Sequence, residues 1–65
     1  MEYKYFTLGR APKVGENIVV NGRRANVRFV SDKRKRIEKY LISRQPELAI
    51  DGGLYAVQVG FEFIN

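Results

Sequence analysis

The dipeptide Asn21-Gly22 constrains the fold of this chain most, because it separates two stretches in which apolar residues alternate with other residues. Asn and Gly adopt the positive φ angles that a two-residue type I′ hairpin turn requires. We therefore predict a β-hairpin whose strands are residues 16–20 and 23–30. A chain of 65 residues with such a hairpin near its middle has room for one small domain.

The turn also fixes which side chains share a face of the hairpin. It pairs Val20 with Arg23 and, one step further from the loop, Val19 with Arg24. Five apolar residues then share one face, which we expect to be the core side: Ile18, Val20, Ala25, Val27 and Phe29. Arg28 and Arg24 lie on the opposite, solvent side.

Two further strands and one helix complete the predicted elements. Residues 1–8 and 54–64 alternate in the way that strands do, and Gly60 in the second of them indicates a bulge or the close approach of another backbone. The apolar face of 54–64 carries Tyr55, Val57, Val59, Phe61 and Phe63. Ser31 and Asp32 are typical helix caps, and Pro46 disfavours helical geometry at the residue before it, so we predict a helix over 32–44.

The predicted fold class is α+β, in a single domain spanning 1–65. A small, twisted, mainly antiparallel sheet of three or four strands has the order β-β-β-α-β, with the one helix packed on it. Ile37, Tyr40 and Leu41 form the apolar stripe of that helix by the i, i+3, i+4 rule. This stripe should meet the apolar side of residues 54–64 and the inner face of the hairpin.

Residues 14–30 also show a Gly-acid pair, alternating valines, a glycine turn and a Val-x-Phe strand. In these features the segment resembles the opening hairpin of SH3-like small barrels, including the KOW-type domains of nucleic-acid and translation proteins. The resemblance implies an alternative fold, an SH3-like barrel with a helical insertion. It implies no particular binding residue.

Positive charge is concentrated in about a third of the chain. Residues 23–44 contain nine Lys or Arg and two acids, a local net charge of +7, whereas the rest of the chain has a net charge of −2. A one-sided field of this kind indicates a negatively charged partner. Four cations, at 33–36, fall in the first turn of the predicted helix, where the macrodipole disfavours each by about 0.3 to 1 kcal/mol. Either they contact phosphates, or they form a solvated face, or the helix begins later.

Composition excludes several chemistries. The chain has no Cys and no His, so it can form neither a disulfide nor the familiar zinc sites or Ser-His and Cys-His nucleophilic pairs. Its seven carboxylates show no spacing typical of metal binding or acid-base catalysis. We therefore expect no enzymatic activity, no metal and no cofactor. The longest apolar run, residues 54–57, is too short to cross a membrane, and we expect a cytoplasmic protein without a membrane partner.

The predicted function is nucleic-acid binding through the phosphate backbone, of DNA or RNA alike. The candidate contacts are Lys33, Arg34, Lys35, Arg36 and Lys39 on the helix, with Arg23, Arg24 and Arg28 on the hairpin. An alternative is a small protein-interaction module or inhibitor that docks its basic face on an acidic protein partner. A homo-oligomer that completes its core at an interface is a further possibility.

Two aromatic residues, Tyr3 and Tyr5, share a face of the first predicted strand. They could stack on unpaired bases, as in proteins that bind single strands. The alternative is that so small a domain needs them for its core.

Overall fold

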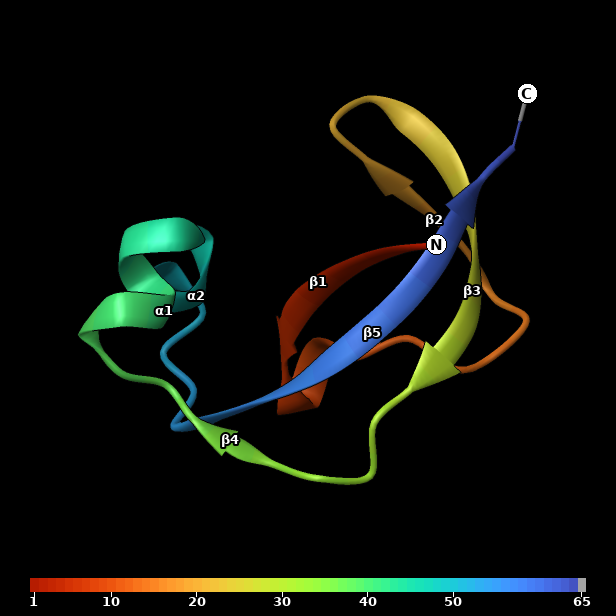
Figure 1. The fold of residues 1–65 in the computed structure, drawn as a ribbon. Coiled ribbons are helices and arrows are strands. Elements are labelled where there is room, and N and C mark those ends of the chain that lie inside the picture. Colours follow the sequence, from red (N-terminus) through yellow and green to blue (C-terminus); the bar gives the residue numbers. More distant parts are fainter. Residues whose placement is uncertain (65) are drawn as a thin grey trace.

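The computed structural model describes residues 1–64, which form an antiparallel sheet that curls into a half-barrel (Figure 1). Its strands are β1 (Glu2–Thr7), β2 (Asn17–Val20), β3 (Arg23–Val30), β4 (Lys35–Arg36) and β5 (Tyr55–Phe63). The order across the sheet is β1-β5-β3-β2, and the short β4 also pairs with β5. A 3-10 turn, η1 (Leu8–Arg10), follows β1, and two short helices, α1 (Lys39–Arg44) and α2 (Glu47–Ile50), precede β5.

The β2–β3 hairpin has the predicted turn and register. Asn21 and Gly22 have φ angles of 52° and 77°, and Val20 pairs with Arg23 and Val19 with Arg24. The prediction of this hairpin is therefore confirmed. A two-residue type I′ turn allows only one register between the strands that it joins.

The predicted position of Phe29 is wrong. Val27 pairs with Phe61 and Phe29 with Gly60, so that Arg28 is an extra residue in β3. This β-bulge shifts the alternation by one residue, turns Phe29 to the outer face of the sheet and brings Val30 to the inner face. Gly60 in β5 had indicated a bulge, and the bulge lies in the partner strand β3, next to the residue that pairs with the glycine.

Two buried hydrophobic clusters lie on the inner, concave face of the sheet. Val27, Val57 and Val59 form one buried cluster, and Val20, Ala25 and Phe61 form another. Ile18 packs against both clusters and joins them. The first cluster is further covered by partly buried residues from the sheet and from the segment after η1: Phe6, Ala11 and Val30.

The predicted helix over residues 32–44 is partly wrong. Helix α1 begins at Lys39, and Lys35 and Arg36 pair with β5 as strand β4. This start keeps the four cations at 33–36 out of the first helical turn, where the macrodipole would disfavour them. Ser31 caps no helix; its Oγ accepts a hydrogen bond from the Lys33 backbone N–H, at 3.1 Å.

The C-terminal end of the predicted helix is confirmed. Helix α1 ends at Arg44, and Gln45 before Pro46 leaves helical geometry, with φ −132° and ψ 83°. The turn at Asp51-Gly52 follows the unpredicted α2, and Gly52 has a φ of 70°.

The expected packing of the helix on the sheet is also wrong. Of the three predicted stripe residues, Leu41 is buried, Ile37 is half-buried and Tyr40 is 48% exposed. None of them packs against the two core clusters. The helical arm, which we define as residues 39–50, instead lies beside β1, at the edge of the sheet (Figure 1).

A glutamine side chain fixes the helical arm to β1. Tyr5 donates its backbone N–H to Gln45 Oε1 and accepts from Gln45 Nε2, both at 2.8 Å. The amide thus takes the place of a neighbouring strand and covers the edge of β1. Thr7 Oγ1 donates to Asp51 Oδ2 at 2.8 Å, and Lys4 Nζ lies 3.5 Å from Glu47 Oε1.

The structure thus confirms the α+β class and the antiparallel sheet, with five strands and two short α-helices in the described residues. The predicted order β-β-β-α-β agrees with the observed order of strands and α-helices except for two additional elements, β4 before α1 and α2 after it.

Candidate nucleic-acid interface

The basic segment, which we define as residues 33–39, begins in a loop that bows away from the edge of β5. Before the loop, Ser31 donates its backbone N–H to the Gln58 carbonyl oxygen at 2.9 Å. After the loop, Lys35 pairs with Ala56. Three residues of the loop, 32–34, therefore lie opposite a single residue of β5, Val57. The two residues that have no place opposite β5 bulge outward with the loop, which contains Lys33 and Arg34.

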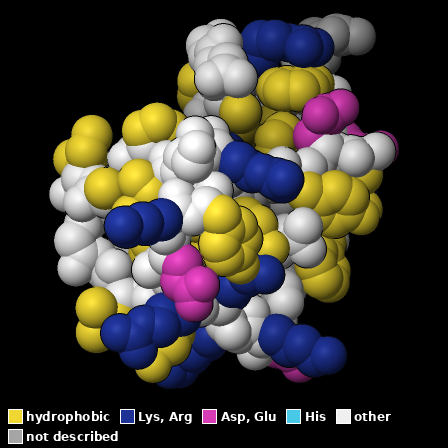
Figure 2. Space-filling model, turned by 60° about the vertical axis from the view of Figure 1, so that its left-hand side comes forward, with side chains coloured by type: hydrophobic (Ala, Val, Ile, Leu, Met, Phe, Trp, Pro, Cys, Tyr) yellow, Lys and Arg dark blue, Asp and Glu magenta, His cyan; other side chains and the backbone are white. Residues whose placement is uncertain are grey.

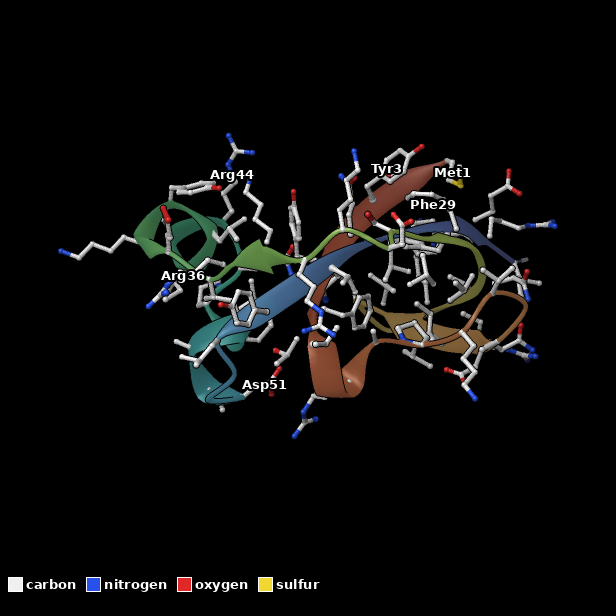
Figure 3. The ribbon with its side chains drawn as sticks, turned by 90° about the horizontal axis from the view of Figure 1, so that it is seen from below. Met1, Tyr3, Phe29, Arg36, Arg44 and Asp51 are labelled. Carbon is white, nitrogen blue, oxygen red and sulfur yellow. The ribbon has the colours of Figure 1, made fainter. Side chains whose placement is uncertain are left out.

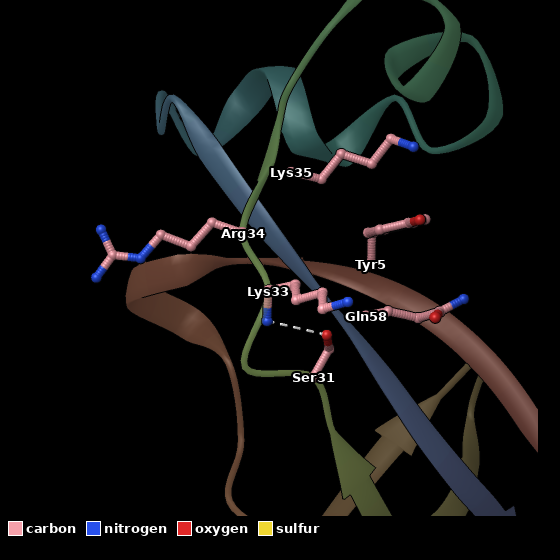
Figure 4. Close-up of a pocket in the computed structure, with 6 residues that line it drawn as sticks. All are labelled: Tyr5, Ser31, Lys33, Arg34, Lys35 and Gln58. Atoms are coloured by element: carbon pink, nitrogen blue, oxygen red, sulfur yellow. Dashed lines mark hydrogen bonds between the residues drawn. The ribbon is translucent and has the colours of Figure 1, made fainter.

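This bowed loop borders an open hollow of about 370 Å³ on the outer face of the sheet. Six residues line it: Tyr5, Ser31, Lys33, Arg34, Lys35 and Gln58. In Figure 4, Lys33 and Lys35 extend toward the side on which Tyr5 and Gln58 lie, whereas Arg34 extends to the other side of the loop. No acidic side chain is among these six, so the hollow is electropositive.

Salt bridges among residues 1–64 leave the charges of the basic segment unpaired. Within residues 1–64, the salt bridges join Lys4 to Glu47, Arg10 to Asp51 and Arg28 to Glu62, and none of them includes residues 33–39. Attraction to the side chain of Tyr40, with a smaller contribution from Tyr5, raises the pKa of Lys35 above its ordinary value. Its Nζ lies 5.3 Å from the centroid of the Tyr40 ring.

The rest of the basic segment extends away from the hollow. Arg36 pairs with Tyr55 and so faces the side of the sheet opposite to Lys35, while Lys39 is exposed at the start of α1. Figure 2 shows Lys and Arg side chains spread over the face that includes the helical arm, with acidic side chains among them. The structure thus brings Lys33 and Lys35 together at the hollow and places Arg36 and Lys39 outside it.

The arginines of the hairpin tip, Arg23 and Arg24, lie far from the basic segment. Ala25, beside the hairpin tip, pairs with Phe63, whereas Lys35 pairs with Ala56. At the usual strand rise these two points are about 23 Å apart along β5. The Arg23 guanidinium lies over the Phe63 ring, 3.9 Å from its centroid, and Arg28 forms a salt bridge of 3.0 Å with Glu62. Arg24 is exposed at the hairpin tip.

Sequence reasoning missed the neutral residues of the hollow, Ser31 and Gln58, and the part that Tyr5 takes in it. No motif marks them, because they meet through the pairing of β1, β5 and the end of β3. The alternation of residues 54–64 could have placed Gln58 on the outer face, on the same side as Gly60.

No protein-family model, curated protein or solved structure matches this chain. The resemblance of residues 14–30 to SH3-like barrels therefore stays a prediction. None of the helices within residues 1–64 is long and apolar enough to cross a lipid bilayer. In the same residues, no three carboxylate side chains gather in a way that could hold a metal ion.

Proposed function

We propose that this protein is a non-enzymatic nucleic-acid-binding domain that holds phosphate groups at the basic segment. Lys33 and Lys35 would make the primary contacts, with Arg34, Arg36 and Lys39 adding to the local field. A curled sheet with this hollow on its outer face would be a rigid support for them, whether or not the fold belongs with the SH3-like barrels.

The observation that carries the proposal is the chemistry of the hollow. Each of the six residues that line it has a side chain that can donate a hydrogen bond, although that of Arg34 extends to the other side of the loop. These are the side-chain types that contact phosphate oxygens in protein–nucleic acid complexes. The hydroxyl of Ser31 accepts from Lys33, which leaves its own hydrogen free to be donated.

The electrostatics of the segment support the same proposal. Adjacent cations repel one another, and this segment has no salt bridge within the described residues to offset that repulsion. A bound phosphate would relieve it. Because such contacts are made to the backbone, affinity should vary little with base sequence and fall steeply with salt.

The test is fluorescence anisotropy of the protein with labelled single- and double-stranded DNA and RNA, at about 50 and 200 mM salt. The variant is Lys33→Gln/Lys35→Gln. Its matched control, Arg23→Gln/Arg24→Gln, removes the same charge from the hairpin tip, beside the far end of β5. We expect the lysine variant to bind about tenfold more weakly at low salt, with a salt slope flatter by about 0.7 for each phosphate that it no longer holds.

Equal losses of affinity in the two variants would contradict the proposal, because they would show a general effect of net charge. Failure of the unchanged protein to bind any of the four nucleic acids at low salt would also contradict it. That second result would favour an acidic protein surface as the partner, which attracts the same cations.

A further inference from the structure

Two aromatic side chains, of Tyr3 and Phe29, stand on the outer face of the sheet on either side of Gly60. Tyr3 in β1 pairs with Gly60 from one edge of β5, and Phe29 in β3 pairs with it from the other. Figure 3 shows these two residues and Met1 gathered on one side of the ribbon. We call these three residues, with Gly60 beneath them, the aromatic platform.

The glycine at position 60 makes the platform possible. A Cβ atom at this position would lie 3.0 Å from Met1 Sδ, 3.1 Å from Tyr3 Cε1 and 3.3 Å from Phe29 Cβ, so any larger residue would push these side chains apart. Gly in the interior of a strand costs stability relative to residues with a side chain. Here it lets the neighbouring side chains close over the backbone.

The platform is not part of the hydrophobic core. Tyr3 is 53% exposed and Phe29 is 42% exposed, and neither packs against the two buried clusters on the inner face. Phe29 reaches the outer face only because of the bulge at Arg28. Bulges are common beside functional sites, where they redirect a side chain. The exposure of both rings leaves them open to a partner with a flat apolar face.

The platform and the basic hollow are neighbours on the same face. Tyr5 and Gln58 line the hollow, and they form the cross-strand pair next but one to Tyr3 and Gly60 in the β1–β5 ladder. Alternate residues of a strand share a face, so the two sites are about 7 Å apart along the strands. Stacking surfaces beside a positive groove are the combination by which proteins hold single strands.

From this juxtaposition we infer that the partner is single-stranded nucleic acid, with unpaired bases stacked on Tyr3 and Phe29 while Lys33 and Lys35 hold the adjacent phosphates. The inference rests on the proposed function and adds to it the strandedness of the partner. In a duplex the flat faces of the bases are already stacked on one another, so the platform would have nothing to hold.

The test compares three probes of about 16 nucleotides, at the upper end of the site size of one small domain: oligodeoxythymidine, an abasic strand of the same length and a duplex. The variant is Tyr3→Leu/Phe29→Leu, which keeps apolar bulk and removes both rings. Tyr3→Phe/Phe29→Tyr keeps both rings, and Tyr55→Leu removes a ring on the other face of β5. Circular dichroism and thermal melting establish that each variant is folded.

We expect the unchanged protein to bind oligodeoxythymidine at least about tenfold more tightly than the abasic strand, and the double leucine variant to lose that preference. The affinity of the double leucine variant for the abasic strand, and the dependence of that affinity on salt, should equal those of the unchanged protein. The ring-retaining variant and Tyr55→Leu should bind as the unchanged protein does. If the leucine variant does not fold, Tyr3→Leu alone should reduce the preference in part.

Salt-dependent binding of all three probes with equal affinity would overturn the stacking inference and leave the proposed function standing. A preference for oligodeoxythymidine that survives in the leucine variant would overturn it as well. No binding of any probe at low salt would overturn both proposals together.

Discussion

The basic segment and the hairpin tip contain the same kinds of side chain, yet the structure surrounds them differently. At the hairpin tip, a tight turn holds Arg23 against the Phe63 ring, and further along β3 Glu62 pairs with Arg28. In the basic segment, Lys35 lies over the Tyr40 ring at the longer distance of 5.3 Å. Lys33 and Lys35 border a hollow and form no salt bridge in the described residues. A cluster of cations in a sequence thus becomes a candidate site through the residues that surround it.

The two regions are also held in place by different means. The hairpin depends on a continuous ladder of pairs between β2 and β3. The basic segment depends on two pairs between β4 and β5, on the Ile37 backbone N–H that donates to the Leu54 carbonyl oxygen at 2.9 Å, and on the helical arm that follows it. A change in the arm should therefore loosen the basic segment and leave the hairpin as it is.

The largest effect should come from Gln45→Leu. This change leaves the N–H and C=O of Tyr5 without partners at a half-buried edge, at a cost of about 2 kcal/mol in the free energy of unfolding. Hydrogen exchange should become faster over the helical arm and β4, while protection over β2 and the first half of β3 is retained. The exposed Ser43→Ala, two positions away, serves as a control that should stay within about 0.5 kcal/mol of the unchanged protein. Uniform loss of protection would show that the two regions are one cooperative unit.

A smaller loss of stability, located in the hairpin and not in the basic segment, should come from Gly22→Ala. Gly22 has a φ of 77° and open space around its Cα, so the substitution introduces backbone strain without a steric clash. We expect a loss of about 1 kcal/mol in denaturant unfolding. Nucleic-acid affinity should not change, because the hairpin tip is remote from the basic segment. Gly9→Ala, also in open space but without a positive φ, is the matched control. A parallel loss of affinity would place the hairpin in the interface.

The smallest effect concerns pH. The Glu47 backbone N–H, assisted by Lys4, lowers the pKa of the Glu47 carboxyl group below its ordinary 4.5. A lowered pKa in the folded state adds stability above the ordinary pKa, and this is lost as the pH falls through the folded value. Thermal melts should therefore show a slightly smaller loss of stability on acidification to about pH 3 for Glu47→Gln than for the unchanged protein. The effect is small because half of this side chain is exposed to solvent. Identical acid profiles would show that the interactions of the Glu47 carboxylate with its backbone N–H and with Lys4 add nothing to stability.

Part of this fold could be predicted from local sequence. Asn21-Gly22 determined both the turn and the register of the hairpin, and alternation placed Val57, Val59 and Phe61 in the core. Pro46 ended α1 where expected. In each case the signal is contained within a few neighbouring residues.

The rest depends on contacts between distant residues. One extra residue in β3 turned Phe29 to the other face, and periodicity cannot locate such an insertion without its partner strand. The position of the helical arm depends on Gln45 meeting Tyr5, forty positions earlier in the chain. Of the candidate site, the cations could be identified from charge, but the hollow and the aromatic platform are products of sheet pairing.

The difference between the basic segment and the hairpin tip can be observed residue by residue in a titration of the isotopically labelled protein with oligodeoxythymidine, followed by amide chemical shifts in NMR spectra. We expect the largest shift changes at residues 31–39 and Gln58, with smaller ones at Tyr3 and Phe29, while residues 21–25 stay unchanged. Shift changes centred on residues 21–25, with none in the basic segment, would contradict the assignment of the basic segment as the nucleic-acid interface.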